Sequence, residues 1–403
     1  MKRKIIAIDI FNFPAKTSGN TVTLLLSGEE ALERNLQLIR SAKSSIHVQT
    51  LYFADDEVGR MLAEPIMEKT TGDMASRIIN DGFHLGKGKK LLKKMSQAGV
   101  DIAINNPRWK FWKLNNRAHE KIFLIDGLTA IEGGRNKARR YYNSREVFDI
   151  DIEFNGPCVN TIQAVYLQNW QRIKGTTFST TDLPKLFPPI KPLENGVQVE
   201  VFHSIPGRRN VITNLFEKMI HKASRLTLVY PYFFPPEKLN NALWTKGRTP
   251  DCAINIYTNG IATTDHPRIL KAAPIYYKSL EHPSQKSMYD KFLFEEHYLD
   301  YYAHSLNGEI VNLWTPRDIF IHAKLLIANR RYIVLGSANM NLRSHYRDSE
   351  IAFFIDDENI AGMLEDRLEQ LRLDHKFDRE KIYFNYRVRD MFIEKVWNFY
   401  NSI

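Results

Sequence analysis

The chain has 403 residues, 43% of them hydrophobic and 25% charged, which is typical of a globular protein whose core needs no disulfides or metals. The two cysteines, Cys158 and Cys252, lie far apart and exclude a disulfide scaffold or a zinc knuckle, and no stretch approaches the ~20 apolar residues of a membrane span. The net charge of +10 favours an anionic partner (a phospholipid surface, nucleic acid or a phosphorylated small molecule), although a soluble basic surface accounts for it equally well.

The N-terminus is basic from Lys2 to Lys4, which is typical of the start of a signal peptide. Asp9, however, interrupts the apolar run that should follow. We therefore expect no signal peptide, no transmembrane helix, and a cytoplasmic or peripheral membrane location.

Two parts of the chain repeat the same order of predicted elements. Residues 29–42 have the periodicity of a helix and residues 45–53 alternate like a strand, and residues 210–223 and 226–233 do the same. Each pair is followed by a further helical stretch and later by a strand that carries His-x-Lys. The repetition indicates a duplicated α/β unit.

The region between the two repeats is rich in proline. Four prolines between residues 176 and 196 predict an extended connector rather than a helix or an inner strand. We place the boundary there, with an N-terminal domain over residues 1–190 and a C-terminal domain over residues 191–403. The predicted fold is α/β, with two similar domains, each a mixed β-sheet flanked by helices, paired as a pseudo-dimer with one shared active site.

A doubled histidine motif stands out from the rest of the sequence. Of twelve histidines, only His119 and His322 are followed two positions later by a lysine, Lys121 and Lys324. In both copies an apolar strand and a glycine-containing turn follow, and an asparagine stands seventeen positions after the histidine. The turns read Gly133-Gly134-Arg135-Asn136 and Gly336-Ser337-Ala338-Asn339. A single histidine is most often an ordinary core or surface residue, but two copies at identical offset indicate a functional motif.

The spacing places the motif's side chains together. In a strand, side chains at i and i+2 share one face, so each histidine projects beside its lysine. Gly133 and Gly336 permit a turn and a close approach of the backbone to a ligand. The turns also supply neutral hydrogen-bond donors for phosphate oxygens, from Asn136, Ser337 and Asn339.

This combination suits the cleavage or exchange of a phosphodiester, with no metal and no cofactor. One neutral histidine would attack phosphorus to form a phosphohistidine, and the other, protonated, would donate to the departing alcohol oxygen. Lys121 and Lys324 would stabilise charge on the non-bridging oxygens.

The motifs resemble those of the phospholipase D superfamily, and specifically its bacterial cardiolipin synthase-like branch, over nearly the whole chain. Residues 117–121 look like that branch's Arg-x-His-x-Lys opening, and residues 133–136 look like its Gly-Gly-x-Asn turn. The segment from His322 to Glu350 is similar to its second motif, and residues 230–235 (Tyr-Pro-Tyr-Phe-Phe-Pro) match a family strand end.

The resemblance implies roles for individual residues. His119 would be the nucleophile and His322 the general acid, although the residues themselves do not rank the two. Glu350 matches a family acid that orients a catalytic histidine. Asp149 is its expected counterpart in the first half, with Asp151 as the rival.

The second copy departs from the family pattern at one position, where Asp126 of the first copy is replaced by Asn329. Asp126 lies seven positions after His119, so on a regular strand it faces away from the histidine. We expect a structural hydrogen bond or ion pair at this position, which an asparagine partly replaces. Activity should therefore be retained.

Several basic segments lie outside the motif. The sequence shows none of the transmembrane helices with which many such synthases begin, so we expect any membrane attachment to come from the protein surface. The candidate segments are residues 108–113 and the tail from Tyr383 to Ile403. Packing on the body is the alternative for both, and the basic–aromatic mixture of residues 108–113 also suits single-stranded nucleic acid. The run 87–94 predicts the solvated face of a helix. Arg135, Lys137, Arg139 and Arg140 would bind a second anionic head group or only line a basic rim.

The leading function is that of a phosphatidyltransferase, which moves a phosphatidyl group from one phospholipid to an alcohol. Cardiolipin formation from phosphatidylglycerol is the leading instance, and a phospholipase D performs the same chemistry with water. The expected partners are anionic or zwitterionic phospholipids and a membrane surface, and the oligomeric state is open. A metal-independent nuclease is the alternative enzyme, and a non-catalytic lipid-binding module would require a broken motif, whereas both histidine–lysine pairs are intact.

Overall fold

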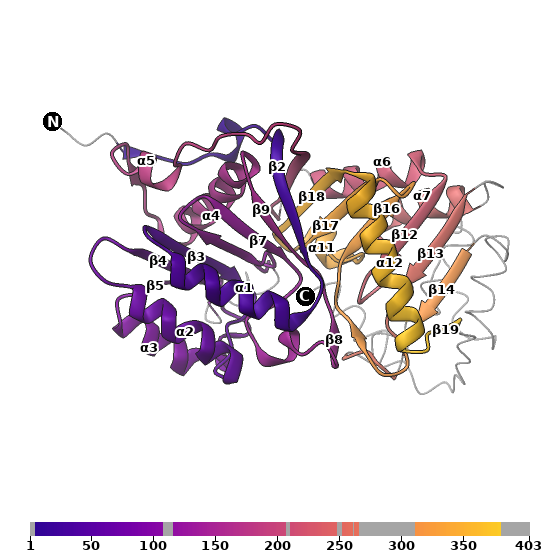
Figure 1. Cartoon of the computed structure of the whole chain (residues 1–403), viewed down its shortest axis with the longest axis horizontal. Helices are drawn as coiled ribbons and strands as arrows, with labels where there is room; N and C mark the ends of the chain where they lie inside the picture. Colours follow the sequence, from indigo (N-terminus) through magenta and orange to yellow (C-terminus); the bar gives the residue numbers. More distant parts are fainter. Residues whose placement is uncertain are drawn as a thin grey trace. The chain divides into compact units, whose positions relative to one another are not determined.

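The computed structural model describes residues 5–107, 116–206, 210–247, 252–260, 262–265 and 311–379. They fall into two compact units (Figure 1). Unit 1 comprises Met1–Pro206, Leu335–Ala338 and Asp348–Asp357, and unit 2 comprises Gly207–Val334, Asn339–Arg347 and Glu358–Ile403. The two candidate membrane segments, residues 108–113 and 383–403, lie outside the described residues.

Unit 1 is built on a mixed sheet. Its strand order is β18-β11-β2-β9-β7-β6-β3-β4-β5, in which β3, β4 and β5 are parallel and every other neighbouring pair is antiparallel. The bounds are β2 (Lys16–Leu25), β3 (Ser45–Thr50), β4 (Ala75–Asp81), β5 (Asp101–Asn105), β6 (Ile122–Ile125), β7 (Thr129–Gly133), β9 (Asp151–Asn155), β11 (Val197–Ser204) and β18 (Glu350–Asp356).

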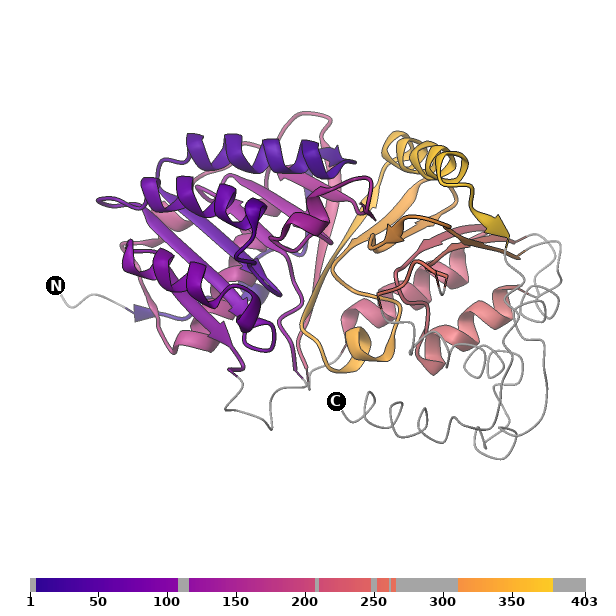
Figure 2. The ribbon, with the colours of Figure 1, turned by 90° about the horizontal axis from the view of Figure 1, so that it is seen from below.

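Helices cover both faces of this sheet. The helices α1 (Gly28–Ser41), α2 (Glu57–Lys69) and α3 (Lys89–Gln97) pack side by side on one face, whereas α4 (Cys158–Lys174) crosses the strands on the other (Figure 2). The predicted helix over 29–42 is α1, which begins where the Ser27 side chain accepts a hydrogen bond from the Glu30 amide. The predicted strand over 45–53 is β3, which ends at Thr50.

Unit 2 repeats the central part of this arrangement (Figure 1). Its strands run in the order β19-β14-β13-β12-β16, where β12, β13 and β14 are parallel and β16 is antiparallel to β12, as β6 is to β3. The strands are β12 (Arg225–Val229), β13 (Ala253–Tyr257), β14 (Val311–Thr315), β16 (Leu325–Ala328) and β19 (Asp378–Arg379), and the helices are α6 (Val211–Lys222), α7 (Glu237–Gly247), α11 (Leu342–Tyr346) and α12 (Glu358–Asp374). The strand β17 (Tyr332–Gly336) starts in unit 2, and its last two residues are assigned to unit 1. The prediction of two similar α/β domains is therefore confirmed.

The connector holds a two-residue strand, β10 (Phe178–Ser179), and a single helical turn, α5 (Leu183–Leu186). The boundary near residue 190 stays a prediction. Unit 1 extends past it to Pro206 and then takes up two short segments from the end of the chain. The second of these segments contains β18, which pairs with β11.

The basic run 87–94 lies on and before α3. Leu91, Leu92 and Met95 are buried, and the lysines from Lys89 to Lys94 are exposed on the other side of the helix, as expected of a solvated face. Within the part of the chain that the structure describes, no helix is both long enough and apolar enough to cross a bilayer.

Candidate active site

The first histidine is fixed by backbone contacts just before β6. The His119 amide donates to the Ser349 carbonyl at 3.0 Å, and the Ser349 amide donates to the Arg117 carbonyl at 2.8 Å. Ala118 thus forms a parallel bridge with Ser349. All these residues belong to unit 1. The strand end that carries His119 is therefore held by a segment from more than two hundred positions later in the chain.

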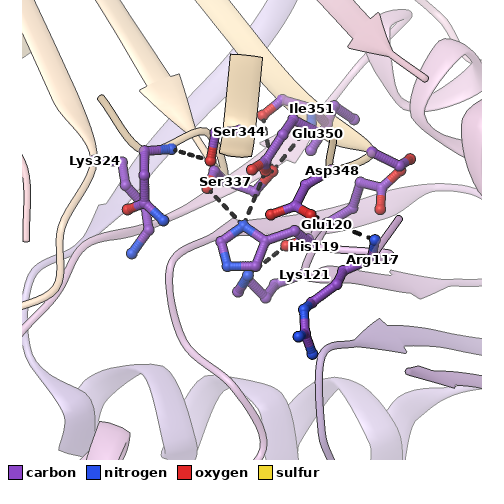
Figure 3. Close-up of polar contacts among 12 residues, drawn as sticks. Arg117, His119, Glu120, Lys121, Lys324, Ser337, Ser344, Asp348, Glu350 and Ile351 are labelled. Atoms are coloured by element: carbon purple, nitrogen blue, oxygen red, sulfur yellow. Dashed lines mark hydrogen bonds and ion pairs between the residues drawn. The ribbon is translucent and has the colours of Figure 1, made fainter. Parts of the chain in front are cut away.

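The ring of His119 is oriented by two acceptors (Figure 3). Its Nδ1 lies 3.0 Å from Oε2 of Glu350 and 3.1 Å from the carbonyl oxygen of Ser337. The Ser337 hydroxyl donates to the same Glu350 oxygen. Since neither a carbonyl nor a carboxylate can donate, Nδ1 must carry the proton. The lone pair of the neutral ring is then on Nε2, the atom that points away from these partners.

The lysine and the asparagine of the first motif are both buried. The Lys121 ammonium donates to the His119 carbonyl. Burial lowers the pKa of Lys121 to about 8, although the carboxylates of Glu350 and Asp149 act to raise it. Asn136, which is almost fully buried, is held by Thr50, whose hydroxyl donates to its Oδ1 at 3.3 Å.

Glu120, between the histidine and the lysine, points to the opposite face of the strand and anchors a buried polar network. Its carboxylate accepts from His203 at 2.9 Å, Asn169 at 3.1 Å, Gln49 at 2.8 Å, and the Ser349 hydroxyl. Burial raises the pKa of Glu120, but these donors, His203 foremost, outweigh it and hold the pKa at about 2. The group therefore remains a carboxylate. The sequence analysis did not identify Glu120 as a supporting residue, although a charged residue in a strand that is buried on both faces indicates a buried polar network.

A second supporting residue that the sequence did not reveal precedes each histidine strand. In unit 1, Oδ2 of Asp81 accepts from the Ala118 amide at 3.1 Å, and burial raises the pKa of Asp81 to about 6. In unit 2, Oδ1 of Asn259 accepts from the Ile321 amide at 2.7 Å, and its Nδ2 donates to the Ile321 carbonyl. Each side chain fixes the residue just before a motif histidine. The available signal was a polar residue at the end of a buried parallel strand, as Asp81 is in β4, or shortly after it, as Asn259 is after β13.

We call the motif histidine, lysine and asparagine of each unit a half-site, and the half-site of unit 2 consists of His322, Lys324 and Asn339. The Lys324 ammonium lies 3.1 Å from Nδ1 of His322 and also donates to the His322 carbonyl. Ala323, between them, is fully buried. The Asn339 amide donates to the Ser344 hydroxyl at 3.0 Å, and among the described residues no group hydrogen bonds to the buried Oδ1 of Asn339. Each unit thus supplies one histidine, one lysine and one asparagine.

The motif glycines lie where a side chain has no room. A Cβ on Gly133 would lie 2.5 Å from the Ile150 carbonyl oxygen, and a Cβ on Gly336 would lie 2.2 Å from that of Ile351. A Cβ on Gly134 would lie 2.2 Å from Oδ1 of Asp149. Both turns therefore pack directly against the strand that follows them.

This packing gives the two acids equivalent places. Asp149 is buried against the first turn, as Glu350 is buried against the second beside Ser337. The rival Asp151 also lies against the first turn, with Oδ1 at 2.1 Å from a Cβ on Gly133, but its Oδ2 faces Arg135 at 3.3 Å from Nη1. By position, Asp149 is the counterpart of Glu350.

Asp126 and Asn329 occupy equivalent tight turns, both with φ of +57°. Oδ1 of Asp126 accepts from the amides of Ser44 at 2.7 Å and Ser45 at 2.9 Å, and Oδ1 of Asn329 accepts from the Ser224 amide at 2.8 Å. These are structural hydrogen bonds to the start of the neighbouring strand, the role expected from the sequence. Asparagine suffices because a single carbonyl oxygen accepts them.

Of the basic residues after the first turn, Arg135 and Lys137 are buried. Arg135 donates to the carbonyls of Tyr141 and Asp149, and Lys137 donates to the Tyr142 hydroxyl at 3.1 Å. Arg139 is exposed beside Glu146. The four residues thus do not form a common rim. Among the described residues, no cluster of three or more histidine, cysteine or acidic side chains is arranged to hold a metal ion.

Known proteins are similar to this chain in sequence and in fold. A model of the family described as cardiolipin synthase, PLD-like domain, matches residues 36–170 and 216–372. The probable cardiolipin synthase YwiE of Bacillus subtilis is 26% identical over 361 residues, which cover 87% of this chain and 66% of that protein. The major cardiolipin synthase ClsA of the same organism is 28% identical over 385 residues, covering 92% and 73%. The chain thus spans about two thirds to three quarters of the length of these relatives.

Solved structures show the same fold at low sequence identity. Phosphatidylserine synthase from Haemophilus influenzae matches with a TM-score of 0.65 and 15% identity over 100% of this chain and 95% of that one. Polyphosphate kinase from Porphyromonas gingivalis matches with a TM-score of 0.54 and 12% identity, over 95% of this chain and 56% of that one. Because the family model matches well over half of its residues, the chain belongs to the cardiolipin synthase family with phospholipase D-like domains.

Proposed function

We propose that this chain is a phosphatidyltransferase that moves a phosphatidyl group from one phospholipid to an alcohol, with cardiolipin formation from phosphatidylglycerol as the leading reaction. The observation that carries the proposal is the state of His119. Its Nδ1–H is held by Glu350 and the Ser337 carbonyl, which leaves Nε2 as a neutral nucleophile. With water as the acceptor, the same chemistry is that of a phospholipase D.

The reaction proceeds in two displacements at phosphorus. Nε2 of His119 attacks, a P–N bond forms and the P–O bond to the departing alcohol breaks while His322 gives that oxygen a proton. The acceptor alcohol then loses its proton to His322, its oxygen attacks phosphorus, and the P–N bond breaks. Both histidines finish in their starting protonation states.

The surrounding groups stabilise charge as it develops. The carboxylate of Glu350, at 3.0 Å, stabilises the positive ring that forms when His119 becomes phosphorylated. Lys121 and Lys324 neutralise the non-bridging oxygens, and the amides of Asn136 and Asn339 donate to them.

The proposal requires that both half-sites act on one phosphorus atom. The doubled motif supports this, because the two displacements need two histidines and each copy of the motif supplies one. The equivalence of Asp149 and Glu350 supports a matching role for Asp149 toward His322.

The decisive experiment measures lipid and nucleic acid turnover side by side. Purified protein is given phosphatidylglycerol or phosphatidylethanolamine vesicles with and without glycerol, and separately single- and double-stranded DNA with chelator. We expect lipid turnover that falls by at least roughly 10⁴-fold in His119→Ala and in His322→Ala. The matched control is His221→Ala, an exposed histidine on α6, which should retain full activity.

Mass spectrometry provides a second measurement. In wild-type protein quenched during turnover the phosphohistidine should be found on His119, and His119→Ala should carry none. Cleavage of DNA without lipid turnover would identify a nuclease and defeat the proposal.

A further inference from the structure

A cluster of basic and aromatic side chains lies next to the first half-site and has no role in the chemistry above. We call it the basic–aromatic cluster, and it consists of Tyr52, Phe83, His84, Lys87 and Arg117. The Arg117 guanidinium carbon lies 3.6 Å from the centre of the Phe83 ring, and the Lys87 ammonium lies 4.6 Å from that of Tyr52. The His84 ring packs between the two aromatics, 4.9 Å from Phe83 and 5.5 Å from Tyr52.

The fold places this cluster where a sheet of this kind binds ligands. Tyr52 follows β3, and Phe83 and His84 follow β4, so the cluster lies outside the carboxyl ends of two parallel strands. Asp81 ties it to the catalytic strand, because Oδ1 accepts from the Phe83 amide at 3.0 Å while Oδ2 accepts from the amide of the residue before His119. Arg117 extends beside that strand (Figure 3).

His84 reports the electrostatic character of the cluster. Burial, followed by the charges of Arg117 and Lys87 and then those of His119 and Lys121, lowers the pKa of His84 to about 4. The ring is therefore neutral at physiological pH and retains one N–H donor in a strongly positive environment. No side-chain hydrogen bond to His84 is formed by any residue that the structure describes. Lys87 is exposed and has no carboxylate partner among these residues.

We propose that the basic–aromatic cluster is a second anion-binding subsite, which holds the headgroup phosphodiester of the acceptor phospholipid beside His119. This inference rests on the proposed function and specifies its acceptor as an alcohol that carries its own phosphate. The cations and the His84 N–H bind that phosphate, and the acceptor hydroxyl, a short spacer away, reaches the phosphorus on His119. The hydroxyl oxygen forms the new P–O bond as the P–N bond breaks, and its proton passes to His322.

Such a subsite would explain how transfer competes with hydrolysis. Water is present at far higher concentration than any lipid alcohol, so an acceptor needs to be held in place to react first. Anchoring by the phosphate turns its attack into an effectively intramolecular step. Glycerol has the same hydroxyls but no phosphate, so it gains nothing from the cluster.

The test compares these two acceptors in one assay. Phosphatidylglycerol vesicles are given equal concentrations of ¹³C-labelled glycerol and differently labelled glycerophosphoglycerol, and the two labelled products are counted by mass spectrometry. The wild type should prefer the phosphate-bearing acceptor, and Lys87→Ala and His84→Gln should each lower the product ratio about tenfold, the effect of one hydrogen bond to a charged group. Lys90→Ala removes an exposed lysine of the same basic run outside the cluster and should leave the ratio unchanged.

The ratio separates binding from folding, because a damaged fold lowers both products together. A ratio that is the same in both cluster variants and the wild type overturns the inference. A protein that makes neither labelled product and hydrolyses no lipid defeats the proposed function instead.

A binding measurement does not depend on turnover. The ¹³C-histidine spectrum of the full chain is followed over pH with glycerophosphoglycerol or inorganic phosphate, and His84→Gln assigns the His84 signal. We expect glycerophosphoglycerol to raise the titration midpoint of His84. A response to inorganic phosphate alone would make this a free-phosphate site, and no response to either would exclude an anion site; both results overturn the inference.

Discussion

The half-sites around His119 and His322 contain the same reacting groups but differ in the groups that support them. Each has one histidine, one lysine two positions later and one asparagine seventeen positions later. At three paired positions the supporting residue is acidic in the first half and neutral in the second. The paired positions are Asp81 and Asn259, Glu120 and Ala323, and Asp126 and Asn329.

The difference shows which features the chemistry requires and which the local packing requires. Where a side chain only accepts hydrogen bonds from backbone N–H groups, the amide oxygen of an asparagine can replace a carboxylate. Asn329 and Asn259 are the two examples. Glu120 is different, because its carboxylate accepts from four donor side chains at once, whereas the alanine in its place in unit 2 is buried and has no polar side-chain atom. The duplicated parts thus diverged where the reaction does not constrain them.

The largest expected effect tests the equivalence of the two acids. Glu350→Gln removes the charge beside Nδ1 of His119 and should lower turnover on the order of 10³-fold, because the phosphorylated ring loses its counter-charge. Asp149→Asn should lower turnover by a similar factor, with Glu358→Gln, an exposed glutamate, as the control. Full activity in Asp149→Asn beside a deep loss in Glu350→Gln would show that the two acids are not equivalent. Initial rates on phosphatidylglycerol vesicles measure both.

The next effect concerns stability and the position between histidine and lysine. Glu120→Ala copies the second half into the first and leaves His203, Asn169 and Gln49 without their common acceptor. We expect a loss of about 3–5 kcal/mol in the free energy of unfolding, as for a buried pair that loses one partner. Ala323→Glu, which copies the first half into the second, should destabilise as well because it places a charge at a fully buried position. Urea unfolding measures both, and equal stability of Glu120→Ala and wild type would contradict the account of the network.

A smaller effect is the alkaline limit of activity. Lys121 has its pKa lowered to about 8 by burial, so it carries its charge below that pH and loses it above. Above pH 8, kcat/KM should fall by up to about tenfold for each pH unit. In Lys121→Arg the guanidinium stays charged, so the kcat/KM of this variant should not change between pH 8 and pH 10. An identical alkaline limb in both proteins would assign it to another group.

The smallest effect comes from exchanging the turn residues. Asn329→Asp should change the free energy of unfolding by less than about 1 kcal/mol and leave turnover within a few-fold, because one oxygen already accepts the backbone hydrogen bonds. Asp126→Asn should cost about 1 kcal/mol, since the second carboxylate oxygen, which faces the Lys43 amide, is lost. Thermal unfolding and a rate assay check both. A manyfold rise in turnover of Asn329→Asp from near zero would show that the second motif is disabled as it stands.

The parts of this site that the sequence predicted are those that repeat at fixed spacing. The doubled motif singled out His119 and His322 as candidates, and the odd offset of Asp126 predicted a structural hydrogen bond, such as the one its Oδ1 accepts from the Ser45 amide. The network around Glu120 was not predictable, because its partners His203 and Ser349 come from 83 and 229 positions away. Only the folded sheet brings them to one strand. Which of the two histidines Glu350 orients likewise depends on strand pairing, and neither the spacing of the motifs nor the composition predicts that pairing.

The contact between His119 and Glu350 joins residues 231 positions apart in a single unit. A ribosome makes the first histidine long before it makes the carboxylate that aligns it, so the N-terminal half emerges with an imidazole that nothing yet orients. A truncated translation product that stops before residue 335 also lacks the Ser337 carbonyl and the strand β18. The ring of His119 can therefore be oriented for catalysis only near the end of synthesis, and prematurely terminated chains keep an unoriented histidine.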